Sequence, residues 1–141
     1  MHNDIADELA SNGWLSRRIA QDAATVPSGP LSGLTYVAKD LFDVAGMPTI
    51  AGSPSNANAS PAQTNAAAIT LLNQAGARLV GLSNMDALAY GFVTDNPLYG
   101  PALNPHDRAR SCGGSSGGSA GAVAAGLVDF ALGTDTAGSV R

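Results

Sequence analysis

Residues 113–141 read GGSSGGSAGAVAAGLVDFALGTDTAGSVR, and this stretch decides how the rest of the chain is interpreted. It holds two loops rich in glycine and serine, 113–118 and 133–139. A helix at about 119–125 and a strand at about 127–132 are expected between them. Glycine lets backbone N–H groups approach a reacting oxygen closely, and a serine in such a loop is a candidate nucleophile. The stretch therefore predicts an acyl-transfer site.

Upstream of these loops, the spacing of apolar residues favours an α/β fold. Short strands are expected at 34–38 and 41–44. A helix with one apolar face is expected from residue 65 to Gly76, which is placed as its C′ glycine, and 78–82 follows as a strand. This order of helix, loop and strand predicts a mixed or parallel sheet flanked by helices.

The other segments carry weaker signals. A loose helical spacing covers residues 4–22, with Asp4 as its N-cap, and Asn84 begins a short helical turn. Clusters of glycine, proline, asparagine and serine indicate three irregular segments, which are a connector at 23–33, a surface loop at 51–64 and a turn-rich stretch at 93–112.

Composition excludes several classes of function. The formal net charge is −4 and the seven basic residues form no long cluster, so nucleic-acid binding is not expected. The N-terminus has neither the basic nor the apolar region of a signal peptide, and the apolar runs are too short for a membrane span. These features predict a soluble cytoplasmic protein, and nothing in the sequence calls for a metal or a cofactor.

A serine nucleophile needs a base, and the sequence offers few. His2 lies at the terminus and His106 in the turn-rich stretch, so their positions support neither a serine–histidine pair nor a pair with Cys112, which is interpreted as a small packed residue. Lys39 is the only lysine and ends an apolar strand. Burial there would lower its pKa and make it a base, whereas a stem that packs with its ammonium in water is the alternative.

At this point the motifs resemble those of the amidase signature family. The first loop reads G-G-S-S-G-G-S and the second G-T-D-T-A-G-S-V-R, with 24 residues from Ser115 to Ser139. The segment 36–40 resembles the lysine motif of the family, and 84–91 resembles its next landmark. The resemblance runs from about residue 30 to residue 141 and implies the amidase signature fold.

The resemblance implies a Ser-Ser-Lys triad that hydrolyses an amide carbon–nitrogen bond. Ser139 would be the nucleophile and Lys39 the final base. Ser115, which would lie in a cis peptide, would relay the proton between them. The resemblance also implies an oxyanion hole made by the backbone N–H groups of Thr136, Ala137, Gly138 and Ser139. Gly113, Gly114 and Ser116 would contact the substrate or shape the loop.

Five residues near these motifs have structural interpretations, which for Ser116 is one of two alternatives. Ser119 is expected to be an N-cap, and Ser116 either hydrogen-bonds within the site or is purely structural. Asp135 and Arg141 are expected to brace the second loop through charge-assisted hydrogen bonds. Asp40 is interpreted as structural.

The length of the chain bears on what it does by itself, because members of the resembled family run to several hundred residues. Residues 1–141 are expected to be the N-terminal portion of a single amidase domain, with a helix and connector at 1–29 and the core segment at 30–141. The residues 88–96 resemble the biuret, carboxybiuret and allophanate hydrolases, with the glutaminase subunit of the tRNA-dependent amidotransferase next. The whole protein would act on a small amide, as a homodimer or in a heteromeric amidotransferase-like assembly.

An alternative of another class remains open. The chain could be a short protein that has lost catalysis and that acts by binding or by pairing with a separate chain. This alternative predicts a stop codon directly after Arg141 and a stable folded product, whereas an open reading frame favours the longer hydrolase.

Overall fold

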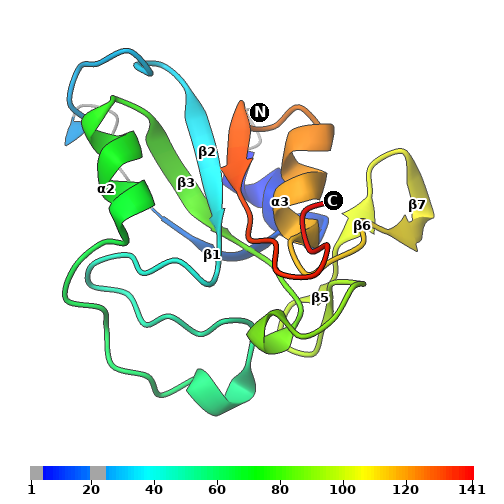
Figure 1. Ribbon diagram of the computed structural model, residues 1–141. Coiled ribbons are helices and arrows are strands. Elements are labelled where there is room, and N and C mark those ends of the chain that lie inside the picture. Colours follow the sequence, from blue (N-terminus) through cyan, green and yellow to red (C-terminus); the bar gives the residue numbers. More distant parts are fainter. Residues whose placement is uncertain (1–4, 20–24) are drawn as a thin grey trace.

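The central element is a mixed four-stranded sheet with the order β1-β3-β2-β8 (Figure 1). The strands are β1 (Leu15–Arg18), β2 (Thr35–Lys39), β3 (Arg78–Ser83) and β8 (Phe130–Leu132). Strand β2 is parallel to β3 and to β8, whereas β1 is antiparallel to β3. This computed structural model describes residues 5–19 and 25–141, and it confirms the α/β fold with a mixed sheet.

The register of the sheet brings the ends of its three parallel strands together. Lys39 pairs with Ser83 at the end of β3, and Ala38 pairs with Leu132 at the end of β8. The segments that leave β2, β3 and β8 therefore start at one edge of the sheet. In open α/β sheets this carboxyl edge is where ligands commonly bind.

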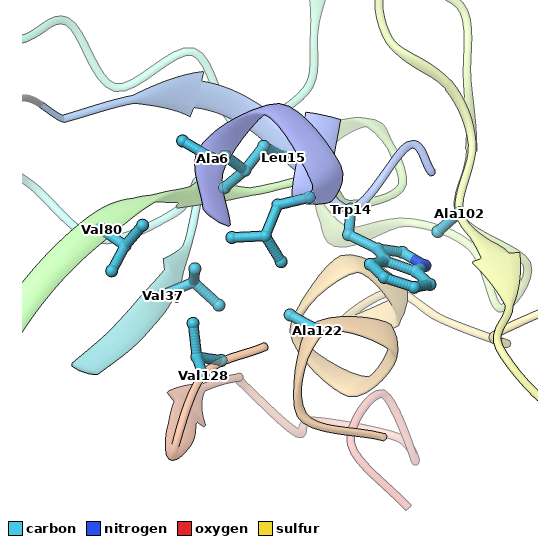
Figure 2. Close-up of a cluster of buried hydrophobic side chains, with 9 residues drawn as sticks. Ala6, Trp14, Leu15, Val37, Val80, Ala102, Ala122 and Val128 are labelled. Atoms are coloured by element: carbon cyan, nitrogen blue, oxygen red, sulfur yellow. The ribbon is translucent and has the colours of Figure 1, made fainter. Parts of the chain in front are cut away.

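Helices cover both faces of the sheet, as α2 (Ala67–Gln74) and α3 (Gly117–Ala124) show on opposite sides in Figure 1. One cluster of buried residues joins α1 (Ile5–Ser11) and α3 to the sheet (Figure 2). The other cluster lies under α2 and includes Ile69, Leu79 and Leu82.

Alternation along β2 decides which way the lysine points. Successive side chains of a strand face opposite sides of the sheet. Tyr36 and Ala38 belong to the cluster under α2, whereas Val37 packs with Ala122 of α3. Lys39 shares its parity with Val37 and therefore faces the side that carries α3.

The long helix expected at 4–22 is wrong, because the helix ends at Ser11 and β1 follows. Gly13 has a φ of 72°, and its N–H donates to the Ala10 carbonyl at 3.0 Å. This turn ends the helix, since a left-handed residue cannot continue it. The N-cap assigned to Asp4 lies outside the described residues.

The strand expected at 41–44 is also wrong. The N–H groups of Leu41 and Phe42 both donate to the carbonyl of Lys39, at 2.6 and 3.0 Å. This turn bends the chain directly after β2. Phe42 and Val44 still find apolar surroundings, because they pack against the cluster under α2.

The helix that ends before Gly76 and the helix after the first glycine loop are confirmed with small shifts, whereas the segments 51–64 and 93–112 contain regular elements that were not expected. Gly76 follows α2 with a φ of 95°, as a C′ glycine does, and helix α3 begins at Gly117. A short 3₁₀ turn occupies Pro54–Asn56. The helical turn expected to begin at Asn84 is wrong, because Asp86 is extended and Leu88, within the turn Ala87–Ala89, has a left-handed φ of 55°. The turn-rich stretch holds two antiparallel pairs of strands, β4 (Asp95–Asn96) with β5 (Gly100–Pro101) and β6 (Leu103–Asn104) with β7 (Asp107–Ser111).

Candidate active site

Lys39 lies fully buried at the carboxyl end of β2. Its Nζ donates to Ser115 Oγ at 2.7 Å and to Thr134 Oγ1 at 2.8 Å. Burial lowers the pKa of Lys39 from 10.5 to about 8, and the nearby charges of Asp86 and Asp135 oppose that fall. The buried-base interpretation of this lysine is thus favoured over the exposed one, and Lys39 and Ser115 are within direct hydrogen-bond reach.

The first glycine loop presents Ser115 to this lysine. Ser115 is fully buried, and the peptide bond between Gly114 and Ser115 is cis, as the family motif implies. The loop ends at the first turn of α3, where the Gly117 N–H donates to Thr94 Oγ1 at 3.0 Å and the Gly118 N–H donates to the Asn84 carbonyl at 3.1 Å. Segments from outside the loop therefore fix its position.

Asn84 joins three distant parts of the chain around the site. Its Nδ2 donates to the carbonyls of Gly13 and Gly100, both at 2.9 Å. Its backbone N–H donates to the Trp14 carbonyl, also at 2.9 Å. A buried amide with this many partners is costly to replace, since each orphaned partner would lose its hydrogen bond.

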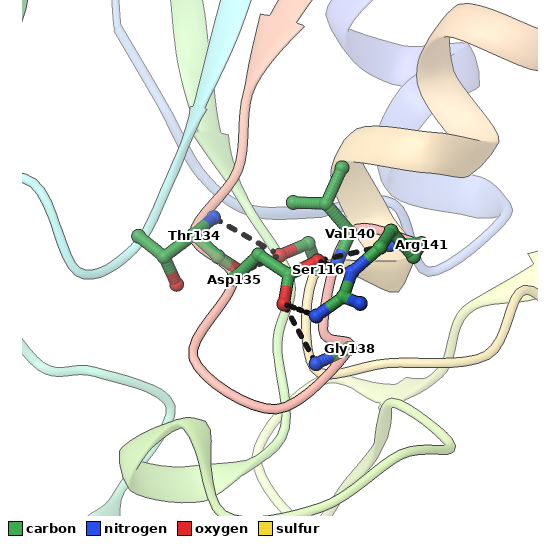
Figure 3. A network of polar contacts seen from close by, with 6 residues as sticks. All are labelled: Ser116, Thr134, Asp135, Gly138, Val140 and Arg141. Atoms are coloured by element: carbon green, nitrogen blue, oxygen red, sulfur yellow. Dashed lines mark hydrogen bonds and ion pairs between the residues drawn. The ribbon is translucent and has the colours of Figure 1, made fainter.

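The second glycine loop closes on one carboxylate, as Figure 3 shows. Asp135 accepts the backbone N–H groups of Gly138 at 2.6 Å and of Val140 and Arg141 at 3.2 Å. The Arg141 guanidinium adds two contacts at 3.0 Å. The Arg141 guanidinium, followed by these N–H groups, holds the pKa of Asp135 well below its usual range. The expectation that this pair braces the loop is confirmed.

Ser116 ties the two loops together. Its backbone N–H donates to the Ser139 carbonyl at 3.1 Å, and its Oγ donates to the Thr134 carbonyl at 3.2 Å. The Thr134 N–H donates back to Ser116 Oγ at 3.3 Å. Of the two interpretations of Ser116, the structure therefore supports hydrogen bonding within the site.

Thr134 was missed at the sequence level. It supplies the second hydroxyl on Lys39, so it shares with Ser115 the work of orienting the amine. The available signal was its position, since a hydroxyl residue two positions after a strand, in a glycine loop, is well placed to face the carboxyl end of the sheet.

Ser139 lies where two cavities meet. One, of about 300 Å³, is lined by residues of the first loop including Gly113 and Gly114. The other, of about 580 Å³, lies between Ser139, Thr136 and Ala137 and the apolar segment 88–92. Within the described part of the chain, the Ser139 hydroxyl makes no hydrogen bond with Ser115 or Lys39, and the backbone of Ser139 carries its link to the first loop.

The four backbone N–H groups expected in the oxyanion hole are not equivalent. The Gly138 N–H is occupied by Asp135 at 2.6 Å. Among the described residues, the N–H groups of Thr136, Ala137 and Ser139 have no hydrogen-bond acceptor. These three donors are available to a ligand oxygen.

Ser119 is not the N-cap that the sequence indicated, because α3 begins at Gly117 with Ser116 at the cap position. The Ser119 hydroxyl is buried against Ser83 Oγ at 2.6 Å and donates to the Leu132 carbonyl at 2.9 Å. It therefore holds α3 to β3 and β8.

Asp40 and Cys112 take structural roles. Asp40 is fully buried and forms an ion pair with Arg17, which connects β2 with β1. Cys112 Sγ donates to the Leu103 carbonyl at 3.2 Å, and burial raises the pKa of this thiol. A raised pKa disfavours the nucleophilic thiolate, which agrees with a packed residue.

No group of three or more histidine, cysteine, aspartate or glutamate side chains in residues 5–19 and 25–141 is placed to hold a metal ion. The helices within those same ranges are all too short or too polar to cross a bilayer.

Comparisons with known proteins show what this chain is similar to. The family model described as Amidase matches residues 9–141. The chain is 54% identical over 112 residues to the AtzE subunit of 1-carboxybiuret hydrolase from Pseudomonas sp. (strain ADP), and the match covers 79% of this chain and 24% of that protein. It is 50% identical over 117 residues to the A subunit of Glutamyl-tRNA(Gln) amidotransferase from Methanospirillum hungatei JF-1, covering 83% of this chain and 27% of the relative.

A solved structure is similar in fold as well. It belongs to a vestigial protein complex linked to the evolutionary origins of an s-triazine catabolic enzyme, and it superposes with a TM-score of 0.87 at 43% identity. The match covers 96% of this chain and 32% of that one. The chain thus spans about a quarter of the length of the curated relatives that it matches.

Proposed function

This chain belongs to the Amidase family, and from that membership we propose that it carries the acyl-transfer centre of a hydrolase that cleaves an amide carbon–nitrogen bond. The observation that carries the proposal is the hydrogen bond of 2.7 Å from buried Lys39 Nζ to Ser115 Oγ. A lysine whose pKa is lowered to about 8 has enough free amine near neutral pH to accept a proton.

In the proposed reaction, Ser139 Oγ attacks the amide carbon and passes its proton to Ser115 Oγ. The proton of Ser115 moves at the same time to the free amine of Lys39, which becomes an ammonium. The tetrahedral intermediate then collapses, and the ammonium returns its proton through Ser115 to the leaving nitrogen. Water repeats the sequence on the acyl-enzyme and releases the acid.

The oxyanion of the intermediate is proposed to lie on the second glycine loop. Thr136, Ala137 and Ser139 offer the N–H groups that have no acceptor of their own among the described residues, and Gly138 fixes the loop through Asp135. Loss of one such donor commonly costs about 2.7–4 kcal/mol of transition-state stabilisation.

The activity is assigned to the complete product of the gene, because the relatives are much longer than the matched segment. Thr136 and Ala137 are exposed in these 141 residues, so water reaches the proposed oxyanion site from one side. Solvent weakens the electrostatic stabilisation that such donors give. We therefore propose that residues 1–141 alone are inactive.

The test is release of ammonia from a panel of small amides, with Ser139→Ala as the decisive variant. The complete gene product is expected to hydrolyse at least one amide of the panel, and the variant is expected to lose that turnover. Ser60→Ala, which changes an exposed serine in the 51–64 loop, is the matched control. Full turnover by Ser139→Ala would remove the proposed nucleophile.

A second candidate is the glutaminase part of an amidotransferase, favoured by the identity of 50% to the A subunit of such an enzyme. The same panel separates the two, since a biuret-type hydrolase prefers small ureido amides and a glutaminase prefers glutamine. Either role allows a separate partner chain. Co-purification from the native host, followed by mass measurement of the assembly, tests that point.

A further inference from the structure

Asp86 follows β3 and places its carboxylate against the segment that leads to the glycine loop. Its Oδ2 accepts the backbone N–H of Thr94 at 2.9 Å and that of Val93 at 3.2 Å. Two N–H donors on one oxygen hold the turn at 93–94 in place, because charge-assisted hydrogen bonds are roughly twice as strong as neutral ones.

Two glycines make room for this carboxylate. A Cβ at Gly114 would collide with Asp86 Oδ2, and a Cβ at Gly91 would lie 2.6 Å from Asp86 Oδ1. The carboxylate therefore packs directly against the backbone of both residues. Any displacement of the Asp86 side chain removes the support under Gly114, the residue before Ser115.

A second route leads from Asp86 to the other end of the loop. Asp86 fixes the backbone of Thr94, and Thr94 Oγ1 accepts the N–H of Gly117 at 3.0 Å. Gly114 and Gly117 flank the two serines of the loop. Asp86 thus supports Ser115 from both sides, directly through Gly114 and indirectly through Thr94.

Asp86 also acts on Lys39 through its charge. The groups around the Lys39 amine are the hydroxyls of Ser115 and Thr134 from the two loops, with the carboxylates of Asp86 and Asp135 as the charged neighbours. Of these two charges, that of Asp86 has the larger effect, and both raise the pKa of Lys39 against the effect of burial.

We propose that Asp86 is a positioning residue for this reaction, which keeps Ser115 Oγ on Lys39 Nζ and stabilises the ammonium that forms when Lys39 accepts a proton. This inference rests on the proposed function. It assigns to one carboxylate both the geometry of the relay and the strength of its base.

The experiment compares Asp86→Asn with Asp95→Asn in the complete gene product. Both variants remove one negative charge, but Asp95 is exposed on β4 and is not among the charges that act on Lys39. Asp86→Asn is expected to lower kcat about ten-fold or more with KM within about two-fold, since misplaced reacting groups lose rate steeply. It is also expected to move the acidic limb of the kcat/KM profile to lower pH. Asp95→Asn should match the wild type in both respects.

A second pair of variants keeps the inference testable if Asp86→Asn does not fold. Thr94→Ser retains the hydroxyl that accepts the Gly117 N–H, whereas Thr94→Val removes it. Thr94→Val is expected to lower kcat while the acidic limb stays at its wild-type pH, and Thr94→Ser should restore the rate. Equal rates in the two variants would overturn the indirect route.

The outcomes also separate this inference from the proposed function. If turnover by the wild type depends on Ser139 but Asp86→Asn has the same kcat and pH profile as Asp95→Asn, the role of Asp86 is overturned and the proposed function stands. A lower kcat for Asp86→Asn with an unmoved acidic limb overturns it as well, because a merely structural role would give that result. Loss of the dependence on Ser139 instead overturns the proposed function.

Discussion

Raising the pH through about 8 is expected to convert Lys39 from an ammonium to a free amine within the folded chain. Burial is the main cause of the low pKa, and Asp86 and Asp135 prevent a deeper fall. With a pKa of about 8, about one chain in ten carries the free amine at pH 7 and about nine in ten carry it at pH 9. A rate that requires the free amine should therefore rise about ten-fold between these pH values.

The direct assay uses lysine labelled with ¹³C at Cε. Lys39 is the only lysine of the 141 residues, so a chain of this length gives a single lysine signal whose position can be followed with pH. The kcat/KM profile of the complete gene product provides the matching kinetic measurement. A signal that titrates near 10.5, the value of an exposed lysine, would refute the reasoning from burial.

The same pKa predicts how stability depends on pH. Below about pH 8 the amine is protonated in both the folded and the unfolded chain, and the folded state bears the full cost of a buried ammonium. Between about 8 and 10.5 the unfolded state binds more protons, so stability rises with pH by at most about 3 kcal/mol. Lys39→Met should abolish this rise in urea unfolding, and an unchanged rise would contradict the assignment.

Two further substitutions test the supports of the loops. Gly118→Ala should destabilise the fold by about 1–3 kcal/mol in urea unfolding, because its Cβ would lie 2.5 Å from the backbone N and O of Asn84; the exposed Ala124→Ser on the same helix is the control, and equal losses would argue against this packing. Asp135→Asn removes the charge that closes the second loop, so kcat should fall about ten-fold or more with little change in KM; a kcat equal to that of the wild type would show that the loop holds its shape without Asp135.

Local sequence patterns were sufficient for the elements that carry the proposed chemistry. A signal within a few residues predicts each of three elements. They are the loop in which glycines flank Ser115 and Ser116, the strand that leads to Lys39, and the helix that ends before Gly76. These signals come from turn chemistry and from apolar spacing, which act over short distances in the chain.

The parts that were missed depend on distant partners. The apolar spacing of Leu9, Trp14 and Leu15 is typical of one helix. In the structure the turn at Gly13 separates the helix from the strand, and the three side chains still pack in one buried cluster. Asn84 donates to a carbonyl that lies 71 residues away. No pattern within a window of about 20 residues contains such a pairing.

The connectivity of the sheet has a consequence for how the protein gains activity as it folds. Strand β8 pairs with β2 across a long stretch of chain, and the Thr35 N–H donates to Asp129 at a sequence separation of 94. Contacts of such long range form late and slowly, because the loop between the partners must first be closed. Thr134 follows β8, so an intermediate without a docked β8 lacks one of the two hydroxyls that accept from Lys39 Nζ. During refolding of the complete gene product, activity is therefore expected to recover later than helix content, which depends on local contacts.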